Sequence, residues 1–219
     1  MFGAQSLKNI ISLASPLRHF GLAAFRARRQ AARFDREHGV DTAGILSQRV
    51  LAVPSPSAPH AIRYRPTTPG AFKQMMTAIP TDLSRFSFVD FGSGKGRVLL
   101  LASHLPFREV IGVEFSAKLH RIAERNIASY RATKPILSKP RAVEADATKF
   151  DLPNGPLVLY FYNPFGAPIL EQVLRRAEMH PAPIFAAYNR PVWRKLFDRS
   201  ERWREVNRRA TSWVNFERI

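Results

Sequence analysis

The strongest constraint on the fold of this chain is an alternation of short apolar runs with helical patterns, which begins at Gly70. The run 157–162 is almost continuously apolar, as expected for a strand that is buried on both faces of a parallel sheet. Strands and helices that take turns along a chain form a parallel sheet covered by helices on both sides. We therefore predict a doubly wound α/β fold with strands at 86–91, 109–114, 141–145, 157–162 and 183–188, and helices at 71–79, 96–104, 117–130, 167–178 and 191–197.

Two further segments with strand patterns end the sequence. Residues 203–210 and 212–219 are separated by a tight link, which predicts a C-terminal antiparallel hairpin. With the five strands above, the hairpin completes a mostly parallel seven-stranded sheet.

A proline-rich stretch separates this region from the N-terminal part of the chain. Five prolines with serine and threonine lie between Val53 and Pro69, and such a composition cannot continue a helix. The expected organisation is a basic helical N-terminal extension (1–52), an extended connector (53–69) and a main domain (70–219).

The extension contains no acidic residue before Asp35, and its arginines alternate with apolar residues at close to helical spacing. Ser15 followed by Pro16 is a good helix start, so we expect one helix from there to about His38. The pattern suits a helix packed on the main domain with its arginines in water, a membrane-surface helix or an organelle transit peptide. We expect a cytoplasmic protein, with a membrane-peripheral or organelle-targeted location as the alternative.

The overall charge favours a polyanionic partner. Lysine and arginine number 34 against 17 aspartate and glutamate, a net charge of +17, which suits RNA, DNA or an anionic membrane surface, or simply solubility.

The sequence has no cysteine, which excludes disulfides, thiolate nucleophiles and cysteine-ligated metals. No apolar run approaches the roughly 20 residues that span a bilayer.

The first predicted strand of the main domain ends in an acid followed by a glycine-rich turn, Asp90-x-Gly92-x-Gly94-x-Gly96. Such a turn lets a ligand approach backbone N–H groups at a helix N-terminus. The spacing differs from G-x-G-x-x-G and from the P-loop. Asp90 would also repel a bound pyrophosphate, because like charges this close in a partly dry site are unfavourable. The ligand is therefore expected to present a cation to Asp90.

Two more acids sharpen this expectation. Glu114 ends the second strand, where an acid accepts hydrogen bonds from both hydroxyls of a ribose, and Asp146 follows the third strand, suited to accept from an exocyclic amine. An ammonium, a ribose and an adenine together describe S-adenosylmethionine (SAM). Taken alone, Glu114 also suits a helix-capping acid before Ser116, and Asp146 a turn former.

The ordered set Asp90-x-Gly92-x-Gly94-x-Gly96, Glu114 and Glu144-Ala-Asp146 resembles the successive motifs of class I, seven-stranded SAM-dependent methyltransferases, over roughly residues 64–219. The resemblance implies a SAM-dependent enzyme. It implies a cofactor site that is made by Tyr64, Asp90, Gly92, Ser93, Gly94, Gly96, Glu114, Asp146, Ala147 and Asn163.

The fourth strand leads into Asn163-Pro164-Phe165, where this family commonly holds the methyl acceptor. Asn163 would accept from an amine, Pro164 would stiffen the turn and Phe165 would exclude water. A plain strand-ending turn is the alternative. Tyr188-Asn189 partly repeats Tyr162-Asn163, which suggests that Tyr188 and both amides share the acceptor site.

The segment resembles the Asn-Pro-Pro-aromatic motif of amino-methylating nucleic-acid enzymes without its second proline, and the asparagine-containing loop of seven-strand lysine methyltransferases. The expected function is methyl transfer to a nitrogen of a macromolecule, with a protein lysine ahead of RNA or DNA. A SAM-binding or RNA-binding module without turnover is the third hypothesis.

No metal site is expected because the six histidines show no ligand spacing. The N-terminal helix is expected to contact an anionic surface.

Overall fold

The structure is a computed structural model that describes residue 25 and residues 28–44, 66–209 and 212–219. Within these residues the helices of the main domain are α2 (Pro69–Thr77), α3 (Arg97–Ala102), α4 (Ala117–Ser129), α5 (Ala167–Glu178) and α6 (Lys195–Asp198). The strands are β1 (Ser87–Phe91), β2 (Val110–Glu114), β3 (Pro140–Glu144), β4 (Leu157–Phe161), β5 (Ile184–Asn189), β6 (Trp203–Arg209) and β7 (Trp213–Arg218).

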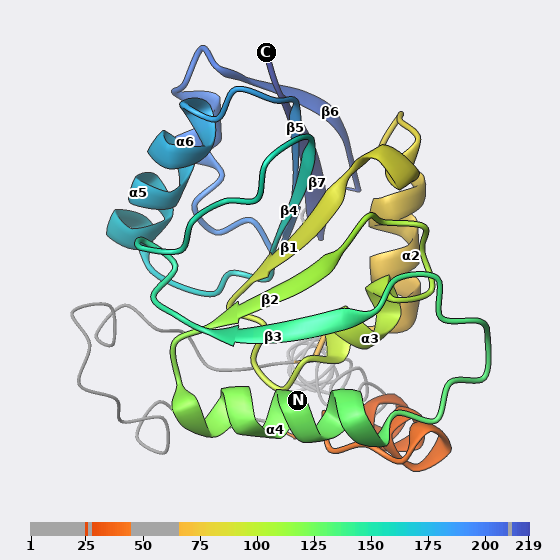
Figure 1. Cartoon of the computed structure of the whole chain (residues 1–219). Coiled ribbons are helices and arrows are strands. Elements are labelled where there is room, and N and C mark those ends of the chain that lie inside the picture. The colour runs from red at the N-terminus through yellow and green to blue at the C-terminus, as the bar shows by residue number, and fades with distance from the viewer. Residues whose placement is uncertain (1–24, 26–27, 45–65, 210–211) are drawn as a thin grey trace, which may run out of the picture.

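The strands form one sheet in the order β3-β2-β1-β4-β5-β7-β6 (Figure 1). Neighbouring strands from β3 to β5 are parallel, and β7 pairs antiparallel with β5 and β6. The predicted mostly parallel seven-stranded sheet with its C-terminal hairpin is confirmed. Because β1, β2, β3 and β4 are parallel, their carboxyl ends share one edge of the sheet, which brings Asp90, Glu114 and the residues after β3 and β4 together.

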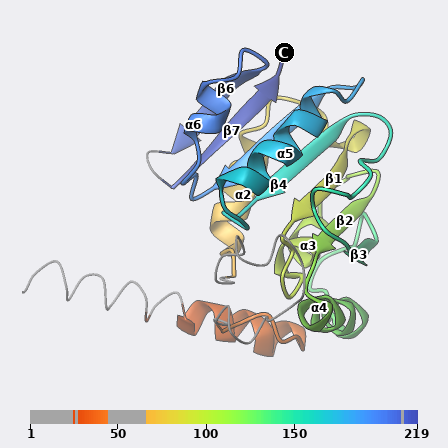
Figure 2. The same cartoon turned by 90° about the vertical axis from the view of Figure 1, so that its left-hand side faces the viewer.

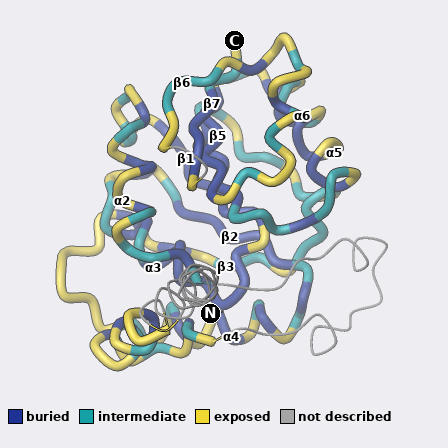
Figure 3. Tube along the Cα trace, turned by 180° about the vertical axis from the view of Figure 1, so that it is seen from behind, coloured by how far each residue is buried: buried dark blue, intermediate teal, exposed yellow. Residues whose placement is uncertain are grey.

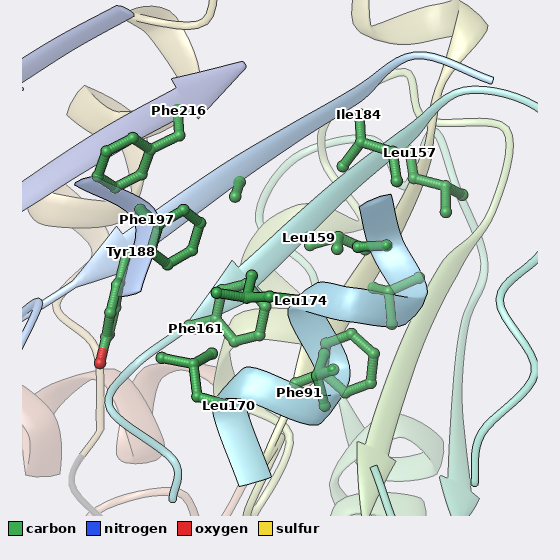
Figure 4. Packing of buried hydrophobic residues seen from close by; sticks show 14 of the residues in the cluster. Phe91, Leu157, Leu159, Phe161, Leu170, Leu174, Ile184, Tyr188, Phe197 and Phe216 are labelled. Atoms are coloured by element: carbon green, nitrogen blue, oxygen red, sulfur yellow. The ribbon is translucent and has the colours of Figure 1, made fainter. Parts of the chain in front are cut away.

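Helices cover both faces of this sheet (Figures 1 and 2). Alternate residues of each central strand enter two apolar clusters, one against α5 and α6 and one against α2 and α3. In β4, Leu159 and Phe161 belong to the first cluster, and Val158 and Tyr160 to the second. Figure 3 shows the central strands as buried, and Figure 4 shows the first cluster, built largely from aromatic and leucine side chains.

Most predicted boundaries differ from the observed ones by one or two residues, but the helix predicted at 191–197 begins four residues later than predicted. Residues 192–194 form a turn, and α6 comprises only Lys195–Asp198. The backbone N–H groups of Arg194 and Leu196 bond to carbonyls three residues earlier, and that of Trp193 donates to the Tyr188 hydroxyl instead of a carbonyl. The Tyr188 hydroxyl therefore satisfies an N–H that has no carbonyl partner at the start of this turn.

The described part of the N-terminal extension packs on the main domain. Residues 28–38 are helical, and the predicted end near His38 is confirmed. Phe34 and His38 are buried, whereas the arginines of the opposite face are exposed, namely Arg28, Arg29, Arg33 and Arg36. The helix lies beside the end of α4 in Figure 1, where His38 Nδ1 is 2.8 Å from the Arg131 carbonyl oxygen. None of the helices within the described ranges is long and apolar enough to cross a membrane.

Candidate functional site

Asp90 is the most unusual residue at the carboxyl edge of the sheet. It lies one residue before the end of β1 with only 3% of its surface exposed. Within the described residues its carboxylate has no hydrogen-bond partner. Burial raises the pKa of Asp90 well above its ordinary value, and the nearby carboxylate of Glu114 raises it further. A buried carboxylate without a counter-charge is costly, so this position favours a cationic ligand.

The glycine-rich turn after β1 is shaped by close backbone contacts. Gly92 has a φ of 74°, and a Cβ there would lie 2.4 Å from Cβ of Pro164. Gly96 has a φ of 83° and is the N-cap of α3, where a Cβ would lie 3.1 Å from Cβ of Ala123. The hydroxyl of Ser93 is buried and has no hydrogen-bond partner within the described residues. This unpaired buried hydroxyl, three residues after Asp90 in the chain, is a second group that a polar ligand would satisfy.

Glu114 ends β2 and is equally buried, at 3% exposed. Its Oε2 accepts from the Gly94 N–H at 2.9 Å, and its Oε1 accepts from the Ser116 N–H at 2.9 Å. Burial raises the pKa of Glu114 to about 7, although the backbone N–H donors act in the opposite direction. The carboxylate therefore organises the turn before α4, and each oxygen keeps a lone pair for a ligand hydroxyl.

Asp146 and Ala147 follow β3 at the same edge. Glu144 is the register partner of Glu114, so Asp146 lies two residues beyond the Glu114 pair. Its Oδ1 accepts from the Thr148 N–H at 2.9 Å and from the Thr148 hydroxyl at 2.7 Å. Asp146 Oδ1 therefore stabilises a turn, as the alternative interpretation of this residue predicted. Ala147 is partly buried against the apolar cluster of α5 and α6.

The residues after β4 meet those of β5. Asn163 has a φ of 46°, and its Oδ1 accepts from the Tyr188 hydroxyl at 3.3 Å. Burial raises the pKa of Tyr188 to about 12. Its ring belongs to the apolar cluster, and its hydroxyl points out of the packed side chains (Figure 4). Pro164 contacts the position of Gly92, whereas Phe165 is a buried member of the cluster. The structure thus joins Asn163, Pro164 and Tyr188 at one corner beside the glycine-rich turn.

Asn189, the second amide that we predicted at the acceptor site, does not lie there. Consecutive residues of a strand point to opposite faces, so Tyr188 and Asn189 cannot share one face of β5. Asn189 Nδ2 donates to the Tyr160 hydroxyl at 3.1 Å, and Thr67 Oγ1 is 2.8 Å from the same oxygen. Asn189 therefore satisfies a buried tyrosine on the α2 face. Tyr64, also predicted at the cofactor site, lies outside the described residues.

Sequence reasoning missed the two cations of the glycine-rich turn. Lys95 and Arg97 are both buried, and they contact Asp41 and Asp35 of the N-terminal extension. The sequence indicated these ion pairs only through the position of Asp35, which is the first acidic residue of the chain. No group of histidines and acids that could hold a metal ion is found among the described residues.

Comparison with known proteins supports the fold. No family model matches the chain, and no curated protein matches it. Among solved structures, the proposed methyltransferase yhhF of Escherichia coli aligns with a TM-score of 0.54 and 18% identity, over 70% of this chain and 87% of that chain. The 23S rRNA methyltransferase ErmE aligns with a TM-score of 0.49 and 12% identity, over 71% of this chain and 70% of that chain. The ribosomal protein L11 methylase of Lactobacillus delbrueckii subsp. bulgaricus aligns with a TM-score of 0.46 and 16% identity, over 67% and 74% respectively. The strand order and the similarity to yhhF establish that the described chain has the fold of class I, seven-stranded SAM-dependent methyltransferases.

Proposed function

We propose that this protein is a SAM-dependent methyltransferase. The observation that carries the proposal is the uncompensated, buried carboxylate of Asp90 beside a second buried acid, Glu114. A phosphate-bearing nucleotide would add negative charge to two carboxylates, whereas the amino acid part of SAM brings an ammonium. In this assignment Asp90 faces the ammonium, Glu114 holds the ribose hydroxyls, and Asp146 and Ala147 flank the adenine.

The chemistry that bound SAM supplies is an electrophilic methyl group on a sulfonium, so the work of the protein is positioning and the exclusion of water. Asn163 is suited to hold a nitrogen acceptor. The Tyr188 hydroxyl donates to Asn163 Oδ1, which fixes the amide and leaves one lone pair of that oxygen for an N–H of the acceptor. Pro164 fills the space against Gly92, which keeps this corner close to the cofactor turn.

The surroundings of this corner support a nucleic acid as the acceptor. No acidic residue occurs between Asp151 and Glu171 or between Glu178 and Asp198, the stretches that contain β4, β5 and the turns that follow them. The turn after β5 instead exposes basic and apolar side chains, namely Arg190, Val192, Trp193 and Lys195. An exposed tryptophan beside cations suits an unstacked base and its phosphate, whereas a lysine ammonium would meet like charge.

Methyl transfer from radiolabelled SAM into separated RNA, DNA and protein tests this proposal. Label that nuclease releases and protease does not would support the nucleic-acid assignment. Label on protein lysine would still support a methyltransferase, but its acceptor would be a protein and not a nucleic acid. Bound SAM without any label would identify a binding module, and failure of the protein to bind SAM would overturn the proposal itself.

A pair of variants locates the acceptor surface. Trp193→Ala should lower labelling of the nucleic acid roughly tenfold, as expected when a stacking contact is lost. Met179→Ala is the matched control, because Met179 is more exposed than Trp193, at 85% against 37%, and precedes β5 at the opposite edge of the sheet. Equal labelling by both variants would contradict the role of Trp193.

A further inference from the structure

The glycine-rich turn is bound on one side by a segment that lies more than 50 residues earlier in the sequence. Lys95 Nζ donates to Asp41 Oδ1 at 2.8 Å and to the Ala43 carbonyl oxygen at 3.1 Å. Arg97 Nη2 donates to Asp35 Oδ1 at 2.9 Å. The side chains of Lys95 and Arg97 are 7% and 3% exposed, so both cations are withdrawn from water.

The segment that supplies these acids is itself held in place by many contacts. Asp35 accepts from the Thr42 and Ala43 N–H groups at 2.8 and 2.5 Å, which closes the turn after the N-terminal helix. The Phe34 ring lies 4.4 Å from the Arg97 guanidinium carbon. These contacts place residues 31–43 against the first turn of α3.

Asn126 of α4 links this support to the backbone of the cofactor turn. Its Oδ1 accepts from the Asp41 N–H at 2.8 Å, and its Nδ2 donates to the carbonyl oxygens of Asp41 and Lys95 at 2.9 and 2.8 Å. Gly94, the neighbour of Lys95, is held from the other side by Glu114. The turn is thus fixed between the cofactor-facing acid and the N-terminal segment.

The direction of the Lys95 side chain matters for the cation site. Lys95 lies between Gly94 and Gly96, whose φ values of 57° and 83° fall in the left-handed region that glycine adopts readily. The ammonium is bound to Asp41 and Ala43, and the pKa of Asp90 is raised by burial and by Glu114 with no offset from a cation. The cation of the turn is therefore directed away from the carboxylate that a ligand ammonium would meet.

We propose that residues 31–43 are a positioning element of the cofactor site, in which Asp41 and Asp35 hold Lys95 and Arg97 so that Asp90 stays available to the ammonium of SAM. This inference rests on the proposed function, and it adds residues outside the methyltransferase motifs to the determinants of cofactor affinity. Asp41 is the residue to test, because its side chain is 68% exposed and its removal leaves the buried Asp35–Arg97 pair intact.

Calorimetric titration of the full chain with SAM, together with thermal unfolding, tests the positioning role. Asp41→Asn should raise the Kd for SAM roughly tenfold, and Asp41→Glu, which retains the charge, should restore most of the affinity. Glu217→Gln is the matched control, because Glu217 forms an ion pair with the exposed Arg204 at 2.6 Å and lies opposite Phe185, toward the other edge of the sheet. Its Kd should remain that of the wild type.

The Asp41→Asn substitution made in a Lys95→Met variant separates a positioning role of Asp41 from a role in folding. In Lys95→Met the cation is absent, so adding Asp41→Asn should leave the Kd unchanged if Asp41 acts by directing Lys95. A wild-type protein that fails to bind SAM would overturn the proposed function and this inference with it. A wild type that binds SAM, combined with an Asp41→Asn variant of equal affinity, would overturn the inference alone. An Asp41→Asn penalty that persists in the Lys95→Met background would also refute it.

Discussion

Glu114 should make the ligand-free protein less stable as the pH rises. Burial raises the pKa of its carboxyl from the ordinary value of 4.5 to about 7, so between these values the folded chain holds a proton that the unfolded chain has lost. The folded state then binds more protons than the unfolded state, and the free energy of unfolding falls with increasing pH. The contribution of Glu114 is complete below about pH 4.5 and is lost as the pH passes about 7.

The size of the effect follows from the two pKa values of Glu114. A difference between 4.5 and about 7 corresponds to about 3 kcal/mol at 1.36 kcal/mol for each pH unit. The raised pKa of Asp90 acts in the same direction. The loss attributed to Glu114 is a large part of the stability of an ordinary domain, which is about 5 to 15 kcal/mol.

Urea unfolding at a series of pH values, compared between wild type and Glu114→Gln, isolates this contribution. Glutamine cannot ionise, so the wild type should lose about 3 kcal/mol relative to the variant between about pH 4.5 and 7.5. Glu144→Gln removes the same charge from the exposed register partner on β3, and it should keep the wild-type pH dependence. Parallel curves for wild type and Glu114→Gln would refute the reasoning.

Three further predictions concern the same edge of the sheet. Asp90→Asn should raise the free energy of unfolding near neutral pH, because it removes an uncompensated buried charge, and should weaken SAM binding by about 1.5 to 3 kcal/mol in calorimetry. Equal SAM affinity would remove Asp90 from the site. Gly92→Ala should destabilise the fold by about 2 kcal/mol or more in urea unfolding, because its Cβ would lie 2.4 Å from that of Pro164, whereas Gly70→Ala, with no atom within 4 Å, should change stability by less than about 1 kcal/mol. Similar values for the two glycine variants would contradict the close contact. Asn163→Gly keeps the left-handed backbone and removes the amide, so it should lower turnover roughly tenfold while the Kd for SAM stays near that of the wild type; a parallel loss of both would indicate a structural residue.

Much of the fold was predictable because it depends on local hydrophobic periodicity. Four of the five parallel strands, β1, β2, β4 and β5, are short runs whose residues are buried on both faces of the sheet, and such runs are visible without knowledge of their neighbours. The edge strand β3 is only partly buried. The helix predicted at 191–197 begins only at Lys195, because the chain first makes a tight turn in which the Val192 and Arg194 N–H groups bond to carbonyls two and three residues earlier. An apolar pattern does not distinguish such a turn from the first turn of a helix.

The features of the candidate site also divide into those that the sequence predicts and those that it does not. Asp90 and Glu114 were recognisable because each lies within one residue of the end of an apolar strand, and parallel strands bring their carboxyl ends to one edge. The partners of the polar side chains were not recognisable. Asn189 seemed equivalent to Asn163 in the sequence, yet the alternation of strand faces sends its amide to Tyr160.

The sequence by itself determined the class of fold, the acidic strand ends and the glycine-rich turn, because these depend on residues close together in the chain. Only the tertiary structure decided which charges meet. Lys95 and Asp41 are 54 residues apart, and their contact exists because the N-terminal helix docks where α3 begins. A buried ammonium is costly without an opposite charge, and the docked segment supplies the acid that Lys95 binds.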